Sequence, residues 1–307
     1  MAFKIRGPES VDQGIKHVAV EQIDKAIQEI ESDEIDQEKT VHQVRKRCKK
    51  MRGLVRLVRP DSEAVYKNEN RRFRNAAKSL SHARDAQVIV ETYGLLLDHY
   101  GEEIDSERFS PIYEALLVRS QQVTEHEVNI EDRLNDFLDE MQQAYKRVEG
   151  WELSPDVSAS ILKGIKKTYK RGRRAMKHAY NKQDATQFHQ WRKRVKYHWY
   201  HMRLLERLWP KQLKQRAEEV KRLSEYLGDD HDLAMLHATL INEVQSPCNG
   251  PLVAELIDLI SKWQVELRSK AKSLGMRIYA ESPKLFMRRI ESYWNAWLTE
   301  SGALHNN

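Results

Sequence analysis

Cysteine is scarce in this chain of 307 residues, which holds only Cys48 and Cys248. Two thiols in a chain of this length do not make a disulfide framework, and their spacing matches no zinc-binding pattern. The sequence therefore gives no reason to expect a fold stabilised by disulfides or by metal. Cys48 falls among the apolar positions of a predicted helix, so we expect it to be a buried, reduced thiol.

Glycine and proline are also few, with 12 and 8 residues, whereas charged residues make up 32% of the chain. A turn-rich β protein needs more glycine and proline, and we find no convincing run of alternating apolar and polar residues. Apolar residues make up 40%, which is enough for a core. This composition is typical of long helices with charged outer faces, and it predicts an all-α fold.

The sequence lacks any apolar run of about 18 residues, the length from which a transmembrane helix is inferred. The opening residues, MAFKIRGPES, also lack the apolar segment of a secretory signal. We therefore expect a cytoplasmic protein with no membrane partner.

Motifs for catalysis and cofactor binding are missing as well. There is no HExxH pair and no glycine-rich phosphate loop, so we expect no catalytic residue, no bound metal and no cofactor. The stretch GDDHD, residues 228–232, resembles a metal cluster. A helix boundary is the simpler interpretation, in which Gly228 ends one helix and Asp229 or Asp230 caps the next.

Capping and stop signals divide the chain into helices. Thr40 and Gln43 have the spacing of a capping box, which would open a helix that Pro60 stops. The segment EGWELSP, residues 149–155, is the best internal boundary. We expect helices near residues 10–30, 41–59, 62–80, 83–100, 110–148, 156–180, 185–208, 211–227, 230–245, 251–275 and 283–299.

Two stretches of the chain match each other at an offset of 147 residues. HQVRKRCKKMR begins at His42 and HQWRKRVKYHW begins at His189, with eight identities in an 18-residue window. The same offset, without a gap, places Asp85 on Asp232 and Leu80 on Leu227. One register held over this length indicates internal duplication. We expect a single domain, 1–307, made of two related helical halves, 8–149 and 155–300, that bury more surface by docking together.

The first copy places its cations on one face of a helix. With helical spacing, an apolar stripe is formed by Val41, Val44, Cys48, Met51, Val55 and Val58, and a basic stripe beside it by His42, Arg45, Lys49, Arg52, Arg56 and Arg59. Like charges one turn apart destabilise a helix by a few tenths of a kcal/mol per pair. An extended anion would relieve this repulsion.

The second copy repeats the geometry, and a third basic stripe precedes it. The second apolar stripe is Phe188, Trp191, Val195, His198, Met202 and Leu205, and its basic stripe is interrupted at Trp199, opposite Arg52 of the first copy. Residues 163–177 hold eight bases and no acid. Such segregation of charge points to an anionic partner.

The histidines that open the two copies, His42 and His189, have two interpretations. In the first turn of a helix the dipole disfavours an added proton and favours an anion, so we expect both residues to line an anion site. A structural hydrogen bond is the alternative.

The segments VHQVRKRCKKMRGLVRLV and FHQWRKRVKYHWYHMRLLE resemble the two histidine-led helices of the CHAD family, the conserved-histidine α-helical domain. LSHARDAQVIV, LGDDHDLAML and TYKRGRRAMKHA resemble further segments of that family, so the resemblance covers most of the chain. It implies two helical bundles related by a pseudo-twofold axis around a basic groove or pore. It also implies non-catalytic binding of inorganic polyphosphate, often at polyphosphate granules.

The predicted polyphosphate-binding residues come from all three basic stripes. Arginine grips phosphate oxygens in bidentate fashion, and lysine acts as a point charge. The predicted residues are His42, Arg45, Lys46, Lys49, Arg52, Arg56, Lys166, Lys170, Arg173, Arg174, His189, Arg192, Lys193, Lys196 and Arg203.

Two other classes of protein stay open. A nucleic-acid-binding module would carry the same electrostatic footprint, although Trp191, Trp263 and Trp294 fall on apolar helix positions rather than on a stacking platform. A scaffold that docks acidic protein partners is the other alternative. The sequence leaves the oligomeric state and the preferred length of polyphosphate open.

Overall fold

The computed structural model describes residues 3–5, 10–32, 34–101, 103–126, 130–154, 157–244 and 250–300. Within these ranges all regular structure is helical, with eleven α-helices and no strand. The predicted all-α fold is therefore confirmed. None of the helices in this part of the chain combines the length and hydropathy needed to cross a membrane.

The helices follow one another with short connections. The first part of the chain forms α1 (Val11–Glu31), α2 (Gln37–Val58), α3 (Glu63–Ser79), α4 (His82–His99), α5 (Ser110–His126) and α6 (Ile130–Glu149). The second part forms α7 (Val157–Lys182), α8 (Ala185–Leu204), α9 (Pro210–Thr239), α10 (Gly250–Ile278) and α11 (Pro283–Glu300). Two 3-10 turns, Ser106–Phe109 and Glu206–Leu208, precede α5 and α9, and a π turn, Leu240–Val244, follows α9.

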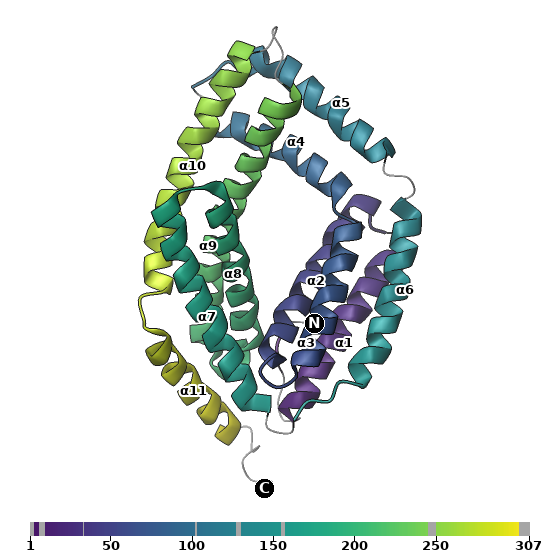
Figure 1. The fold of residues 1–307 in the computed structure, drawn as a ribbon, viewed down its shortest axis with the longest axis vertical. Coiled ribbons are helices and arrows are strands. Elements are labelled where there is room, and N and C mark those ends of the chain that lie inside the picture. The colour runs from purple at the N-terminus through teal and green to yellow at the C-terminus, as the bar shows by residue number, and fades with distance from the viewer. Residues whose placement is uncertain are drawn as a thin grey trace.

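The helices are arranged as an elongated ring (Figure 1). One side of the ring holds α1, α2, α3 and α6, and the other holds α7 to α11. At one end α4 and α5 reach across to α9 and its π turn, and near the other end α2 packs against α7 and α8. The basic helices α2 and α8 therefore come from opposite sides of the ring.

Two hydrophobic cores hold the ring together, and each contains residues from both sides of the boundary at 149–155. The larger core joins α1, α2, α3 and α6 to α7, α8, α11 and parts of α9 and α10. The smaller core joins α4 and α5 to the rest of α9 and α10. Within the described residues neither half of the chain has a core of its own, so the two halves stabilise each other.

Both predicted apolar stripes are buried. Val44, Cys48 and Val55 of α2 and Trp191 and Val195 of α8 are 0% exposed. Burial raises the pKa of the Cys48 thiol to about 12, which keeps it protonated and unreactive, as expected. The second cysteine, Cys248, lies outside the described residues.

The helix boundary predicted at GDDHD is wrong. Gly228 lies inside α9, which runs without interruption from Pro210 to Thr239. Asp230 is buried and pairs with Arg268 of α10 at 2.6 Å instead of capping a helix. A Cβ at Gly228 would lie 3.4 Å from the guanidinium of Arg192. This glycine is therefore an interior residue of α9 that packs beside Arg192 and does not end the helix.

Two other boundaries also differ from the prediction. The single helix expected over 110–148 is two helices, α5 and α6, and residues 127–129 between them lie outside the described residues. The helix expected from residue 41 begins at Gln37, where the Asp36 carboxylate accepts a hydrogen bond from the Lys39 amide at 2.8 Å. Thr40 thus lies within the helix and does not cap it, and its hydroxyl donates to the Glu29 carbonyl at 3.3 Å.

An unexpected charge lies in the core beneath α2. The Lys50 side chain is 5% exposed, and its amine donates to Gln22 at 3.2 Å and lies 5.7 Å from the centre of the Phe3 ring. Burial, and then the charge of Arg47, lower its pKa to about 7. Because this pKa is below the value of about 10.4 in an unfolded chain, charging Lys50 opposes folding.

We predict that Lys50→Met raises the free energy of unfolding by roughly 1–4 kcal/mol, the range for replacing a buried charge by an apolar side chain. The folded protein holds fewer protons than the unfolded chain between pH 7 and 10, so the wild type gains stability as pH rises through this window. The gain from the substitution is therefore larger at pH 6 than at pH 9. Urea unfolding at pH 6 and at pH 9 measures this difference, and the exposed Lys182→Met is the charge-matched control. An equal gain in the free energy of unfolding at the two pH values would contradict the prediction.

Candidate anion-binding site

The basic stripes of α2 and α8 meet at a cavity of about 370 Å³. Lys49 and Arg52 reach it from α2, and Arg74 reaches it from α3. The α8 residues that line it are His189, Arg192, Lys193, Lys196, Tyr197 and Tyr200. Six lysine or arginine side chains and no carboxylate are among these lining residues. Cations from opposite sides of the ring thus share one solvent-accessible space.

An arginine in each basic helix pairs with an aspartate on a neighbouring helix. Arg45 of α2 lies 3.7 Å from Asp85, and Arg192 of α8 lies 3.6 Å from Asp232. Arg45 also donates to the Ala77 carbonyl at 2.7 Å. These four residues are the ones that the 147-residue offset aligns, so the same contact occurs twice in the chain. Each aspartate orients its arginine and offsets part of its charge.

Neighbouring cations oppose the charge of two lysines in the cavity. Desolvation, and then the charge of Lys196, lower the pKa of Lys49 to about 7, although its side chain still reaches solvent. Desolvation, and then the charge of Arg192, lower the pKa of Lys196 to about 8. The cavity is therefore a place where positive charge is unfavourable until an anion offsets it.

The two histidines differ in their surroundings. His189 lines the cavity, and its ring centre lies 3.9 Å from that of His231, the histidine of GDDHD. Burial, and then the charge of Lys193, lower the pKa of His189 to about 4, so it is neutral at pH 7. His42 is exposed and is not among the lining residues. Since α2 begins at Gln37 and α8 at Ala185, both histidines lie in a second helical turn, which corrects the expected dipole effect.

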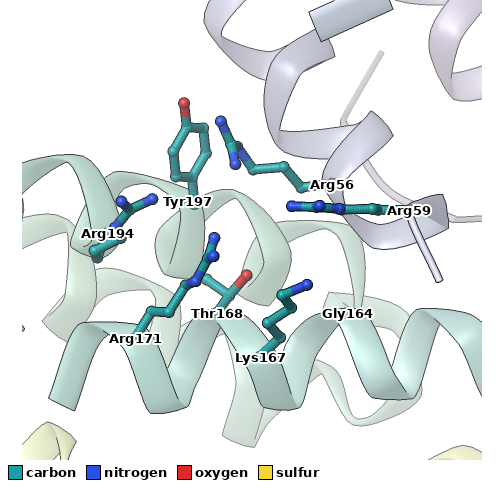
Figure 2. A pocket seen from close by; sticks show the side chains of 8 residues that line it. All are labelled: Arg56, Arg59, Gly164, Lys167, Thr168, Arg171, Arg194 and Tyr197. Carbon is teal, nitrogen blue, oxygen red and sulfur yellow. The ribbon is translucent and has the colours of Figure 1, made fainter. Parts of the chain in front are cut away.

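A second, smaller basic cavity of about 20 Å³ lies beside the first. Figure 2 shows five basic side chains from three helices that converge on it. They are Arg56 and Arg59 of α2, Lys167 and Arg171 of α7, and Arg194 of α8. Tyr197 lines both cavities and is therefore the wall between them.

The arginines of α2 are held in place at the smaller cavity by polar and aromatic neighbours. Arg56 stacks 4.1 Å from the centre of the Tyr197 ring and donates to Tyr66 at 3.1 Å and Asn70 at 3.2 Å. Arg59 makes two hydrogen bonds to Glu63, at 2.8 and 2.9 Å. In the described part of the chain, Glu63 is thus the only carboxylate that bonds to any of these five cations. The group keeps most of its positive charge.

A close contact between α7 and α2 brings these cations together. A Cβ at Gly164 of α7 would lie 2.7 Å from the Leu57 carbonyl oxygen and 2.8 Å from the Leu57 Cα. Only glycine allows this approach, which places Lys167 and Arg171 opposite Arg56 and Arg59. Gly164 and Thr168 are small residues buried on the face of α7 that meets α2. Their positions in the sequence indicate this face, which the spacing of the basic residues alone does not.

The structure brings together about half of the predicted binding residues. Lys49, Arg52, His189, Arg192, Lys193 and Lys196 line the larger cavity, and Arg56 lines the smaller. Lys166, Lys170, Arg173 and Arg174 are exposed on α7 and line neither cavity, and Lys46 also lines neither. Arg203 lies 5.7 Å from the centre of the Trp199 ring, at a third cavity of about 280 Å³. The predicted set omits Arg59, Arg74, Lys167, Arg171 and Arg194.

Comparisons with known proteins agree on one family. A family model described as "CHAD domain" matches residues 18–241 of this chain. The crystal structure of the CHAD domain from the plant Ricinus communis is similar in fold, with a TM-score of 0.61 and 18% sequence identity over 92% of this chain and 96% of that chain. A search of curated proteins found no match.

We predict that Arg192→Gln raises the pKa of the Lys196 amine, because Arg192 is the charge that lowers it most and its removal also frees the Asp232 carboxylate. NMR titration of the lysine side chains measures this pKa directly. Arg203→Gln, on the same helix beside Trp199, is the control and should leave it in place. An unchanged Lys196 pKa in the Arg192 variant would show that these two residues are not coupled.

We predict that Gly164→Ala lowers the free energy of unfolding by about 1–3 kcal/mol, the usual cost of overpacking, because its methyl group would meet the backbone of α2. Gly94→Ala in α4 is the matched control, since a Cβ there meets no atom within 4 Å. That control should be neutral or stabilising by about 0.5–1 kcal/mol. Urea unfolding of both variants decides the matter, and equal stability of the two would refute the contact.

Proposed function

Because the chain belongs to the CHAD domain family, we propose that it is a non-catalytic binding module for inorganic polyphosphate. The observation that carries the proposal is the 370 Å³ cavity with six lysine or arginine side chains and no carboxylate among its lining residues. Polyphosphate is a flexible polyanion that carries no nucleobases, so it is recognised by repeated cations rather than by shape or stacking. We propose a location in the cytoplasm, at polyphosphate granules.

We propose that one polyphosphate chain crosses both basic cavities. Tyr197 separates the two, so successive phosphates on either side of it would meet Lys49 and Lys196 on one side and Arg56 and Arg171 on the other. Affinity then rises with chain length, because each further phosphate binds at a high effective concentration. It falls with added salt, by analogy with the release of counterions from nucleic acids.

Ligand binding in this site is coupled to protonation. Desolvation, and then repulsion by neighbouring cations, lower the pKa values of Lys49 and Lys196 in the empty cavity. A bound polyanion would raise both values, so the protein takes up protons on binding near pH 8. The exposed cations of α7, such as Lys166 and Lys170, would extend the surface for longer chains.

The two matched arginine–aspartate pairs support the duplication inferred from the sequence. We propose that residues 8–149 and 155–300 are duplicated halves of one domain, each of which contributes one histidine-led basic helix. Arg45 with Asp85 and Arg192 with Asp232 are then the same structural device in each half. The ligand would contact both copies at once, which explains why two basic stripes occur in one chain.

We predict that purified protein binds long-chain polyphosphate more tightly than single- or double-stranded DNA of matched charge, and that raised salt weakens binding. Fluorescence or calorimetric titrations at two salt concentrations measure both effects. Equal or tighter binding to DNA would instead favour a nucleic-acid module. Binding to neither would leave the basic stripes as a docking surface for acidic proteins.

A pair of variants with equal changes in charge locates the site. Lys49→Gln combined with Lys196→Gln should weaken polyphosphate binding about tenfold or more, since a hydrogen bond to a charged group contributes about 1.5–3 kcal/mol. Lys182→Gln combined with Lys284→Gln removes the same charge from exposed positions on α7 and α11 and should have little effect. Equal losses in the two double variants would show that net charge, and not the cavity, determines affinity.

A further inference from the structure

A further cleft, of about 410 Å³ and distinct from the three cavities above, lies between α9, the end of α10 and α11. It shares no lining residue with the two basic cavities. Its walls on α10 and α11 come from residues after 241, beyond the stretch that the family model matches. This volume falls within the range of about 300–1,000 Å³ that is usual for small-molecule sites.

Four arginines line this cleft, and two of them are paired with glutamates. Arg222 lies 3.5 Å from Glu219 on the same helix, and Arg289 of α11 lies 2.6 Å from Glu281. These two pairs are close to neutral. The charge that remains in the cleft belongs to the other two arginines.

Arg216 and Arg277 supply positive charge without a carboxylate partner in the described chain. Arg216 donates to the Ile278 carbonyl at 2.8 Å, and its guanidinium lies 4.8 Å from the centre of the Phe286 ring. Arg277 is exposed and makes no ion pair with the described residues. Burial, and then the charge of Arg289, lower the pKa of Arg216, so the empty cleft disfavours this charge.

Part of the cleft wall is apolar. Leu213, Leu274 and Ile278 are 2%, 7% and 4% exposed and belong to the larger core. Tyr293 presents its ring beside them and is held edge-to-face against Trp209, with the ring centres 4.8 Å apart. A flat apolar group fits this wall better than a hydrated inorganic ion does.

We propose that this cleft binds a small organic phosphate of the size of a nucleoside monophosphate, with its phosphate on Arg216 and Arg277 and its ring against Tyr293. Arginine matches the geometry of phosphate oxygens with paired hydrogen bonds. A phosphate monoester carries about −1.5 to −2 charge at pH 7, which matches the two unpaired arginines. A monocarboxylate would leave one of them uncompensated. The proposal does not depend on polyphosphate binding.

AMP, adenosine and inorganic phosphate are the probes that test the cleft, in calorimetric titrations of the full chain. We expect AMP to bind most tightly, because adenosine lacks the phosphate and inorganic phosphate lacks the ring. Arg277→Gln should weaken AMP binding by about tenfold, a loss of about 1.4 kcal/mol. Arg277 is exposed, so the fold should survive this change, and circular dichroism and the Tm check that it does.

Two control variants keep this test separate from the basic cavities. Arg288→Gln removes the same charge from an exposed position on α11 outside the cleft and should leave AMP binding unchanged. Lys49→Gln with Lys196→Gln should weaken polyphosphate binding and spare AMP. The proposal is overturned if AMP fails to bind at millimolar concentration, if Arg288→Gln weakens it as much as Arg277→Gln, or if only the lysine pair weakens it.

Discussion

Cations on α2 and α8 face each other across one cavity, and the rest of the structure has to offset their repulsion. Lys49 and Lys196 come from opposite sides of the ring. Desolvation, and then the positive charges nearby, lower the pKa of each lysine. The opposing free energy comes from the two hydrophobic cores, which join both halves of the chain. The halves cannot separate to relieve the repulsion without exposing core side chains. The cores therefore hold these cations close together in the absence of a ligand.

Aspartates and a glycine set the detailed geometry of this surface. Asp85 and Asp232 orient Arg45 and Arg192 but offset only part of the positive charge, so the arginines remain able to bind an anion. Gly164 lets α7 approach α2 closely enough for Lys167 to join the smaller cavity. Positive charge is concentrated by packing, since the cations come from four different helices, α2, α3, α7 and α8.

The chain separates two kinds of arginine-rich surface. The cavities at Tyr197 combine lysine and arginine from α2, α7 and α8 and suit a long, flexible polyanion. The cleft at Tyr293 combines two unpaired arginines with an apolar wall and suits a compact ligand with one phosphate group. The two surfaces share no residue, so a single chain has room for both ligands at once.

Helical periodicity in the sequence determined the all-α fold, the buried stripes of α2 and α8 and the cations beside them, because side chains spaced three and four residues apart must share a helix face. Tertiary structure alone decided which cations meet. Lys166 and Lys167 are neighbours in the sequence and both are exposed, but the 100° turn between them places only Lys167 at the cavity, near Arg59. Gly228 looked like a helix end and lies inside α9, beside the guanidinium of Arg192. Local sequence signals carry no information about a neighbour from another helix, and the contacts of α2, α7 and α8 supply it.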